Sequence, residues 1–396
     1  MAGALDGVVV LEAAQIMAGP FCGLLLADMG ADVIKVEKPG TGDDTRRMGP
    51  AFLGGEATAF LTINRNKRSA VLNLKSEGGR DALRRLATRA DVFLQNYRPG
   101  VLEGLGLGPE DLRSLNPRLI YCSISAFGQT GPYSARGGFD LVAQGMSGLM
   151  SVTGEPGRPP VKVGVPITDL NAGMYAAYGI LCAYIHRLRT GRGQVVDTSL
   201  LEGGIAYTFW ESAQYWGTGE VPGPMGSAHR LSAPYQALRT KDGYLNIGAA
   251  NQATWEALCD ALGRPDLAAD PRFAHPTDRR AHYQELAGLL ETVFIREPTA
   301  HWLEVLEKAG VPAGPIYDLG QMYRDPHVLA RGMLAEVEHP SAGRFPQIGI
   351  PVKLSETPGC IVRPAPRLGE HTDEVLAGAG YTPAEIAALR AEGAVG

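Results

Sequence analysis

The amino-terminal part of the chain alternates short apolar runs with a helical stretch, and this alternation constrains the fold more than any other feature. Residues 7–14 (GVVVLEAA) are typical of a buried strand, residues 19–29 are small and apolar as in a helix, and residues 31–37 (ADVIKVE) form a second apolar run. Gly30 can end the helix in a left-handed conformation. A strand–helix–strand unit of this kind implies a parallel sheet with right-handed crossovers.

The alternation continues to about residue 200. Further strands are predicted at 69–74, 91–97, 118–125 and 194–201, and helices at 78–90 and 170–190. In the last of these helices apolar residues recur at helical spacing, as at Met174, Ala177, Tyr178, Leu181, Ile185 and Leu188. We therefore expect an α/β fold with an open, mostly parallel sheet, in which ligands bind at the carboxyl ends of the strands.

The pattern changes at about residue 225. Residues 235–250 predict two strands joined by a turn at Lys241-Asp242-Gly243. Helices are predicted near 252–263, 278–296 and 299–309, and short strands return at 331–355. A final helix has Thr382 as its N-cap, followed by Pro383 and Glu385. We expect a large domain over 1–200, a linker at 201–224, a small α+β domain at 225–325 and a last segment at 326–396.

Composition and charge exclude several classes of protein. The net charge is −5, whereas a protein that binds nucleic acid usually carries an excess of basic residues. No apolar run reaches the roughly 18 residues that a membrane span needs. The five cysteines are scattered and form no CxxC pair, which argues against a disulfide framework and a zinc site. The first residues lack the features of a signal peptide. We expect a cytoplasmic protein, or one of an organelle matrix after removal of a transit peptide, with no metal.

A dinucleotide-binding function is disfavoured by the first strand–helix turn. Such a function requires a GxGxxG sequence there, and the turn from Ala13 to Pro20 contains a single glycine. The glycines at 104, 106 and 108 follow a helical stretch instead and do not match. A GxSxG nucleophile elbow is also absent from the sequence.

Asp169 stands where an extended segment enters the long helix predicted at 170–190. The free N–H groups and the positive end of the helix dipole favour an anion at this place, which would keep the carboxylate ionised and usable as a nucleophile. The alternative is that Thr168 or Asp169 merely caps the helix.

Two further features suggest ligand binding. Basic residues follow predicted strand ends at Lys38, Lys75 and Arg98, and Arg136 lies in a glycine-containing loop; together they are expected to bind phosphates, or singly to be surface charges. The small residues at 248–251 permit close approach of a ligand to the backbone, or form a plain turn.

Many short motifs, in order along nearly the whole chain, closely resemble those of the class III CoA-transferases. They are residues 5–11 (LDGVVVL), 18–20 (AGP), 26–37 (LADMGADVIKVE), 42–46 (GDDTR), 64–69 (NRNKRS), 96–100 (NYRPG), 116–121 (NPRLIY), 128–133 (GQTGPY), 190–194 (TGRGQ), 229–235 (HRLSAPY), 241–244 (KDGY) and 310–315 (GVPAGP).

The resemblance implies a Rossmann-like large domain built from both chain ends, a small domain between them, and a homodimer of two interlocked chains. It places the family's catalytic aspartate on Asp169. It also implies that coenzyme A and its thioesters are the substrates. The positions implied to contact CoA are Gln15, Ile16, Met17, Lys38, Leu72, Asn73, Leu74, Lys75, Asn96, Tyr97, Arg98, Arg136, Gly137, Gly138, Phe139 and Asp140.

The same resemblance concerns the acid that accepts CoA. The segment from Gly226 to Tyr235 is similar to transferases that use succinyl-CoA and a dicarboxylic acid such as glutarate, malate, citramalate or mesaconate. His229 and Arg230 are expected to meet the distal carboxylate, although Arg230 is equally consistent with a surface charge. Gly248, Ala249 and Ala250 are expected to line the substrate site, with backbone N–H groups that stabilise oxyanions. Met17 departs from formyl-CoA transferases, which carry glutamine at this position, and the loop at 248–251 is not all glycine.

Two alternatives of different class remain. An α-methylacyl-CoA racemase shares the resemblance, but it needs a histidine where this chain has Phe139, and phenylalanine transfers no proton. A CoA-binding protein without catalytic activity is the other, and the presence of Asp169 argues against it.

Overall fold

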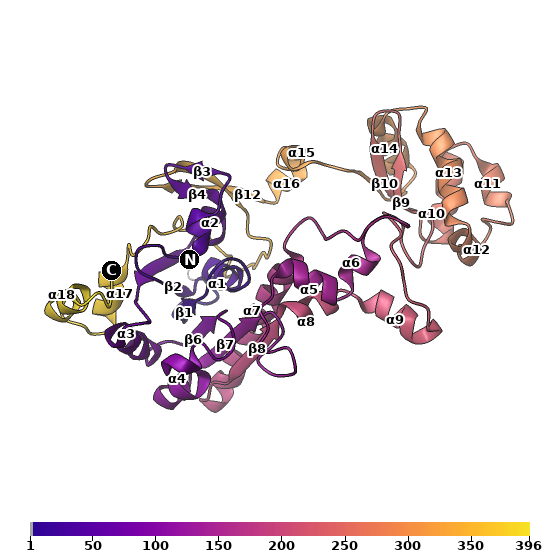
Figure 1. The fold of residues 1–396 in the computed structure, drawn as a ribbon. Helices are drawn as coiled ribbons and strands as arrows, with labels where there is room; N and C mark the ends of the chain where they lie inside the picture. The colour runs from indigo at the N-terminus through magenta and orange to yellow at the C-terminus, as the bar shows by residue number, and fades with distance from the viewer. Residues whose placement is uncertain (1–2) are drawn as a thin grey trace. The chain divides into compact units, whose positions relative to one another are not determined.

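A six-stranded parallel sheet forms the centre of the larger part of the chain in the computed structural model, which describes residues 3–396 (Figure 1). The strands lie in the order β5-β2-β1-β6-β7-β8, and every neighbouring pair is parallel. They are β1 (Val9–Ala13), β2 (Asp32–Glu37), β5 (Lys67–Val71), β6 (Val92–Gln95), β7 (Ile120–Ser125) and β8 (Val195–Ser199). The predicted parallel α/β sheet is confirmed, with strand ends shifted by a few residues.

The strand order fixes where a ligand can bind. The chain begins at β1 in the middle of the sheet, builds outward through β2 and β5, and then returns to the other side of β1 with β6. The connections that leave β1 and β6 therefore run in opposite directions, and a crevice opens between their carboxyl ends. The loops that follow Ala13 and Gln95 border this crevice.

Side chains alternate between the two faces of the sheet, and helices cover both faces. Leu11 and Ala13 of β1 join one core cluster, whereas Val10 and the residue before the strand, Val8, join the other. The first cluster packs against α3 (Glu77–Ala87), α4 (Pro109–Leu115), α17 (Thr372–Gly378) and α18 (Pro383–Ala391). The second packs against α1 (Ala18–Asp28) and α7 (Ile167–Thr190), as Figure 1 shows. Gly30 has the positive φ expected after α1, at 106°.

Helix α7 has two chemically different faces. Its buried face consists mainly of small residues, such as Ala172, Gly173 and Ala176. A Cβ on Gly173 would lie 2.6 Å from the carbonyl oxygen of Ala18, so glycine is what permits α7 to pack this closely on α1. The large apolar residues of the predicted stripe point the other way: Tyr178 is 65% exposed and Leu188 is 67% exposed.

The carboxyl end of the chain returns to the edge of the sheet beside β5. The N–H of Asn73 donates to the carbonyl of Ala394 over 2.8 Å. Helix α18 begins with the predicted capping box, in which Thr382 and Glu385 exchange hydrogen bonds. Smaller elements around this part are η1 (Asp44–Arg47), β3 (Phe52–Leu53), β4 (Glu56–Ala57), α2 (Thr58–Ile63), η2 (Glu103–Leu105), α5 (Asp140–Met146), α16 (Pro326–Ala330), β12 (Leu334–His339) and β13 (Gly343–Ile348).

The chain forms two compact units. The first contains the chain up to Leu149, together with Lys162–Ser212 and Pro326–Gly396, and the second contains Met150–Val161 and Ala213–Asp325. The stretch 201–224, expected as a linker, carries most of α8 (Leu200–Ile205) and all of α9 (Phe209–Thr218).

None of the helices within residues 3–396 combines the length and apolarity that crossing a membrane requires.

The second unit is a small antiparallel sheet with helices. Its strands β9 (Tyr235–Arg239) and β10 (Tyr244–Gly248) form the predicted hairpin, and β11 (Ala313–Pro315) pairs with β10. The helix predicted at 278–296 is wrong as a single element, because α12 (Pro276–Ala281) and α13 (Tyr283–Phe294) are separated at His282. The buried guanidinium of Arg279 donates to the carbonyls of Ala233 and Phe273, which anchors α12 separately. The helices are α6 (Leu149–Val152), α10 (Gln252–Ala261), α11 (Pro265–Ala269), α12 (Pro276–Ala281), α13 (Tyr283–Phe294), α14 (Thr299–Lys308) and α15 (Leu319–Met322).

Candidate active site

A pocket of about 410 Å³ lies at the crevice between the carboxyl ends of β1 and β6. Its wall includes the loops after β1 and β6, the end of β7, a glycine-containing loop and the first turn of α7. The lining residues are Gln15, Ile16, Met17, Ala18, Asp44, Asn96, Tyr97, Arg98, Pro99, Val101, Ile124, Ser125, Ala126, Arg136, Gly137, Gly138, Phe139, Asp169 and Leu200.

Asp169 is in the first turn of α7 and faces this pocket. The N-cap position of the helix is Pro166, and it makes no side-chain capping bond. The anion at this helix end is Asp140, whose Oδ1 accepts from the Thr168 N–H over 3.0 Å and from the Thr168 hydroxyl over 2.8 Å. The interpretation that Thr168 or Asp169 merely caps the helix is therefore wrong, because a residue distant in sequence does so.

The protonation of Asp169 differs from the expectation that the helix end keeps it ionised. Burial, reinforced by the nearby Asp140 carboxylate, raises the pKa of Asp169 from 3.8 to about 7. The helix N–H that would stabilise a negative charge is bound to Asp140 instead. Near neutral pH the Asp169 carboxyl therefore exists in both forms. Its ionised form is more basic than an ordinary carboxylate and hence a stronger nucleophile.

Two arginines lie at the pocket beside the glycine-containing loop. A Cβ on Gly137 would lie 2.9 Å from the Arg98 guanidinium, so the backbone of the loop packs directly on this arginine. The Arg136 guanidinium stacks over the Tyr133 ring at 4.0 Å. Phe139 is 76% exposed at the end of the loop. Two cations and an exposed aromatic ring make this side of the pocket suited to an aromatic, anionic ligand.

Most of the predicted CoA contacts meet in this one pocket. They are Gln15, Ile16, Met17, Asn96, Tyr97, Arg98, Arg136, Gly137, Gly138 and Phe139, together with Asp169. Lys38 and Asp140 do not line the pocket themselves. The Lys38 ammonium lies 2.7 Å from the carboxylate of Asp44, which does line it. The Asp140 carboxylate is held by Thr168 and by the amide of Gln144.

The predicted contacts from Leu72 to Lys75 lie along a different part of the sheet edge and are not among the lining residues. Leu72 is buried and pairs with Val395, and the Asn73 amide donates to the carbonyl of Gly393 over 3.0 Å. Lys75 is exposed. This segment therefore joins the carboxyl end of the chain to the sheet.

The predicted acid-binding residues belong to the second unit. The His229 ring packs on Tyr235 with 4.8 Å between the ring centroids, and Arg230 donates to the carbonyl of Gly223 over 2.7 Å. The N–H groups of Gly248 and Ala249 donate to the carbonyls of residues 312 and 234. These two N–H groups are therefore already paired, contrary to the expectation that they stabilise an oxyanion. Ala250 is exposed at the end of this loop.

A set of buried charges that the sequence patterns did not predict lies directly behind the pocket. Glu12 and Lys35 lie inside apolar strands and have no exposed surface. The signal was present in the sequence, because a charge within a strand that is buried on both faces requires a partner. Eight other lining residues were also missed, namely Ala18, Asp44, Pro99, Val101, Ile124, Ser125, Ala126 and Leu200. Ser125 and Ala126 stand at the carboxyl end of a predicted strand, and this position was the available signal.

Comparisons with known proteins point to one family. The sequence model of CoA-transferase family III matches residues 5–372. The chain is 41% identical to the human succinyl-CoA:glutarate CoA-transferase, covering 94% of this chain and 85% of that one. It is 40% identical to the acetyl-CoA:oxalate CoA-transferase of Acetobacter aceti, covering 93% and 94%. A CAIB/BAIF family protein from Brucella suis has a similar crystal structure, with a TM-score of 0.86 and 40% identity over 96% of this chain and all of that one.

Proposed function

The chain belongs to CoA-transferase family III, and from this premise we propose that it moves coenzyme A from succinyl-CoA to a dicarboxylic acid through a covalent intermediate on Asp169. The observation that carries the proposal is the position of this carboxylate, which has a raised pKa and faces a pocket that also contains two arginines. The names of the two relatives support the substrate class, because glutarate and oxalate are both dicarboxylic acids.

Binding of the acyl-CoA is assigned to the first unit. Arg98 and Arg136 bind the phosphates by charge-assisted hydrogen bonds, and Phe139 offers an aromatic surface to the adenine. Lys38 lies beside the pocket, where its ammonium pairs with the lining residue Asp44. The thioester carbonyl then lies within reach of Asp169, as nucleophilic catalysis requires.

The first half of the reaction transfers CoA to the enzyme. The ionised Asp169 attacks the thioester carbonyl of succinyl-CoA, the carbon–sulfur bond breaks, and a succinyl–aspartyl anhydride and CoA thiolate form. The thiolate then attacks the aspartyl carbonyl, which releases succinate and leaves an aspartyl-CoA thioester. The thioester bond is exchanged rather than hydrolysed, so the reaction needs no additional energy source.

The second half repeats these steps in the opposite direction. The carboxylate of the acceptor acid attacks the aspartyl thioester, giving a second anhydride and CoA thiolate. The thiolate attacks the acceptor's carbonyl in this anhydride, which forms the new acyl-CoA and returns Asp169 as a carboxylate. His229 and Arg230 are assigned to the distal carboxylate of the acceptor acid.

The proposed assembly is a homodimer of interlocked chains. The support in this chain is the outward face of α7, where Tyr178, Ile185 and Leu188 are each at least half exposed. Large apolar residues grouped on one helix face are costly in water and typical of a protein interface. A dimer would cover them, and it should keep twice the mass of the single chain at nanomolar dilution. A stable folded monomer in light scattering would contradict this assembly.

The decisive experiment is a transfer assay with a trap. Purified protein is mixed with succinyl-CoA and a panel of acids, namely glutarate, malate, citramalate, mesaconate and oxalate, and acetyl-CoA serves as an alternative donor. We expect succinyl-CoA and at least one dicarboxylic acid to give transfer. Hydroxylamine added with succinyl-CoA alone should modify Asp169, as peptide mass spectrometry would show. Asp169→Ala should abolish both transfer and modification; modification of a different residue would contradict the assigned nucleophile.

A further inference from the structure

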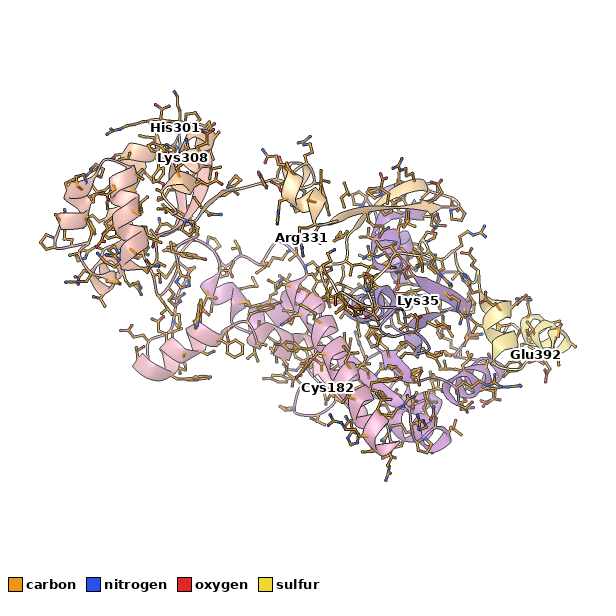
Figure 2. The ribbon with its side chains drawn as sticks, turned by 180° about the vertical axis from the view of Figure 1, so that it is seen from behind. Lys35, Cys182, His301, Lys308, Arg331 and Glu392 are labelled. Carbon is orange, nitrogen blue, oxygen red and sulfur yellow. The ribbon has the colours of Figure 1, made fainter. Side chains whose placement is uncertain are left out.

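Four charged side chains that the proposed reaction does not use are buried behind the pocket. Glu12, Lys35 and Lys67 have no exposed surface, and Asp43 is 3% exposed. Lys35 lies in the interior of the first unit (Figure 2). A buried charge is unfavourable unless it is paired and hydrogen-bonded, so this group needs a reason to exist that packing alone does not supply.

The four charges form one continuous network. The Lys35 ammonium lies 2.8 Å from Glu12 Oε1 and 2.8 Å from Asp43 Oδ2. The Lys67 ammonium lies 2.7 Å from Glu12 Oε2 and donates to the carbonyl of Pro20 over 2.8 Å. Helix α1 makes room for this arrangement, because a Cβ on Gly23 would lie 1.9 Å from Glu12 Oε2.

The network reaches the pocket wall through two contacts with the loop after β1. Lys35 donates to the carbonyl of Ala14 over 2.9 Å. Asp43 Oδ1 accepts from the N–H of Ile16 over 3.2 Å, and also from the N–H and hydroxyl of Thr45. Lys35 and Asp43 therefore hold the loop at two successive places along its backbone.

Ile16 is the residue of this loop whose backbone conformation most requires stabilisation by its surroundings. Its φ is +72°, in the left-handed region that a β-branched side chain strongly disfavours. Such a conformation persists only where surrounding contacts impose it, and it is found preferentially at functional sites. Asn96 holds the other side of the loop, since its amide exchanges two hydrogen bonds with the backbone of Gln15, of 2.9 and 2.7 Å.

We propose that Lys35 and Asp43 are positioning residues for the acyl-CoA pocket. They fix the loop of residues 14–17, whose Gln15, Ile16 and Met17 line the same pocket as Asp169, in a conformation that Ile16 would otherwise leave. The inference rests on the proposed function, because it assigns the network a role in that reaction. Lys35 and Asp43 are not themselves among the residues lining the pocket, so their effect on the reaction is through the loop.

The sharpest perturbation is Asp43→Asn. The carboxylate offers two acceptor oxygens, one toward Lys35 and one toward Ile16 and Thr45. An amide of the same shape offers a single acceptor oxygen and two donors, so one of the two sides must lose its contact. The substitution keeps the volume of the side chain and leaves every lining residue of the pocket unchanged.

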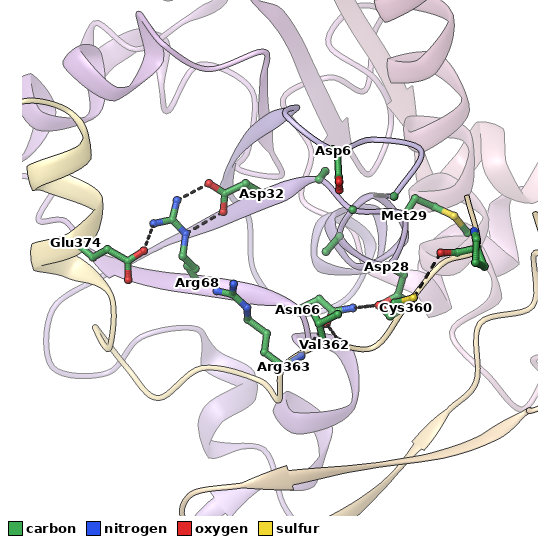
Figure 3. Close-up of a pocket in the computed structure, with 15 residues that line it drawn as sticks. Asp6, Asp28, Met29, Asp32, Asn66, Arg68, Cys360, Val362, Arg363 and Glu374 are labelled. Carbon is green, nitrogen blue, oxygen red and sulfur yellow. Dashed lines mark hydrogen bonds and ion pairs between the residues drawn. The ribbon is translucent and has the colours of Figure 1, made fainter. Parts of the chain in front are cut away.

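A matched control is available at the other end of the same strands. The Asp28 carboxylate is also buried, and it accepts from Arg65 over 3.0 and 2.6 Å and from Asn66 over 2.8 Å. It lies in a second pocket, which Asp32 and Arg68 line at the amino ends of β2 and β5 (Figure 3). Asp28→Asn therefore breaks a comparable buried ion pair without touching the loop of residues 14–17.

The test compares the two variants with the wild type in the full-length protein, with activity expressed per mole of folded enzyme at saturating succinyl-CoA. We expect both variants to lose thermal stability to a similar degree, whereas kcat falls at least ~10-fold in Asp43→Asn and less than ~2-fold in Asp28→Asn, since misplacement of a pocket wall is costly to catalysis. Equal activity of the two variants would overturn the proposal. An inactive wild type would instead overturn the proposed function.

A second pair of variants covers the case in which Asp43→Asn fails to fold. Thr45→Val removes one hydroxyl that orients Asp43 but keeps both charges, and it should lower kcat by a few fold with little loss of stability. The same substitution is then made in a protein that also carries Ile16→Gly. There Thr45→Val should lower kcat much less, because glycine adopts a positive φ without steric cost and does not need the contact with Asp43 to keep it. The same fold-loss in both backgrounds would overturn the proposal.

Discussion

Replacing Asp169 by asparagine should make the protein more stable above neutral pH while abolishing transfer. The reason is the environment of the carboxyl group, because burial, reinforced by the Asp140 carboxylate, raises the pKa of Asp169 from 3.8 to about 7. A folded protein that holds a carboxyl group in such surroundings is destabilised whenever that group is ionised. Asparagine has a similar shape and no charge to desolvate, so it removes this cost.

The size of the effect follows from proton linkage. Below about pH 4 the Asp169 carboxyl is protonated in both the folded and the unfolded chain, so its shifted pKa costs nothing there. Between about pH 4 and pH 7 the folded chain retains a proton that the unfolded chain has released, and the free energy of unfolding falls by about 1.4 kcal/mol per pH unit. Above about pH 7 the loss is complete and amounts to at most ~4 kcal/mol.

The assay is chemical unfolding of the wild type and Asp169→Asn at pH 5 and at pH 8. The stability advantage of the variant should grow by about 2.5 kcal/mol between these two conditions. Leu170→Ala is the control, because it removes no titrating group from the same helix turn, and its difference from the wild type should not change with pH. An advantage of Asp169→Asn that is equally large at both pH values would refute the argument from desolvation, even if the variant is inactive.

Three further predictions address neighbouring residues. Asp140→Asn should shift the rise of the pH–rate profile to lower pH, because it removes the charge that adds to the raised pKa of Asp169; an unmoved profile would leave burial as the sole cause. Arg98→Ala should raise the KM for acyl-CoA by ~10-fold with little change in kcat, whereas Lys75→Ala, outside the pocket lining, should raise it less; equal effects would contradict the pocket assignment. Tyr178→Glu should prevent assembly of the dimer in light scattering, because it places a charge on an exposed apolar helix face; an unchanged dimer would place the interface elsewhere.

Local sequence patterns were sufficient to predict the six strands of the parallel sheet and several of the longer helices, and the reason is physical. A strand of the parallel sheet is buried on both faces, so apolar residues predominate in 7–14 and 31–37. The predicted helix at 278–296 failed because an apolar period does not reveal what a single polar residue binds. Arg279 anchors its turn to carbonyls at residues 233 and 273, and α12 ends soon afterwards, at Ala281.

The electrostatics of the site could not be predicted in this way. The sequence places Asp169 at the start of a helix, and a helix end favours an anion. It does not reveal that Asp140, 28 positions earlier than Thr168, occupies the helix N–H. Likewise, Gln15 and Asn96 are 81 positions apart, yet they exchange two hydrogen bonds at the pocket. Contacts of this separation depend on the strand order, which local patterns do not contain.

The composition of α7 explains how the carboxylate comes to face the pocket. Small residues on the inner face of α7 let it approach α1 so closely that a Cβ on Gly173 would meet the carbonyl of Ala18. Ala18 begins the helix that follows the loop of residues 14–17, so this close packing ties the first turn of α7 to the wall that Lys35 and Asp43 hold. The positions of Asp169 and of that loop are therefore coupled through backbone contacts. It follows that a larger residue at position 173 should reduce transfer even though it touches neither substrate.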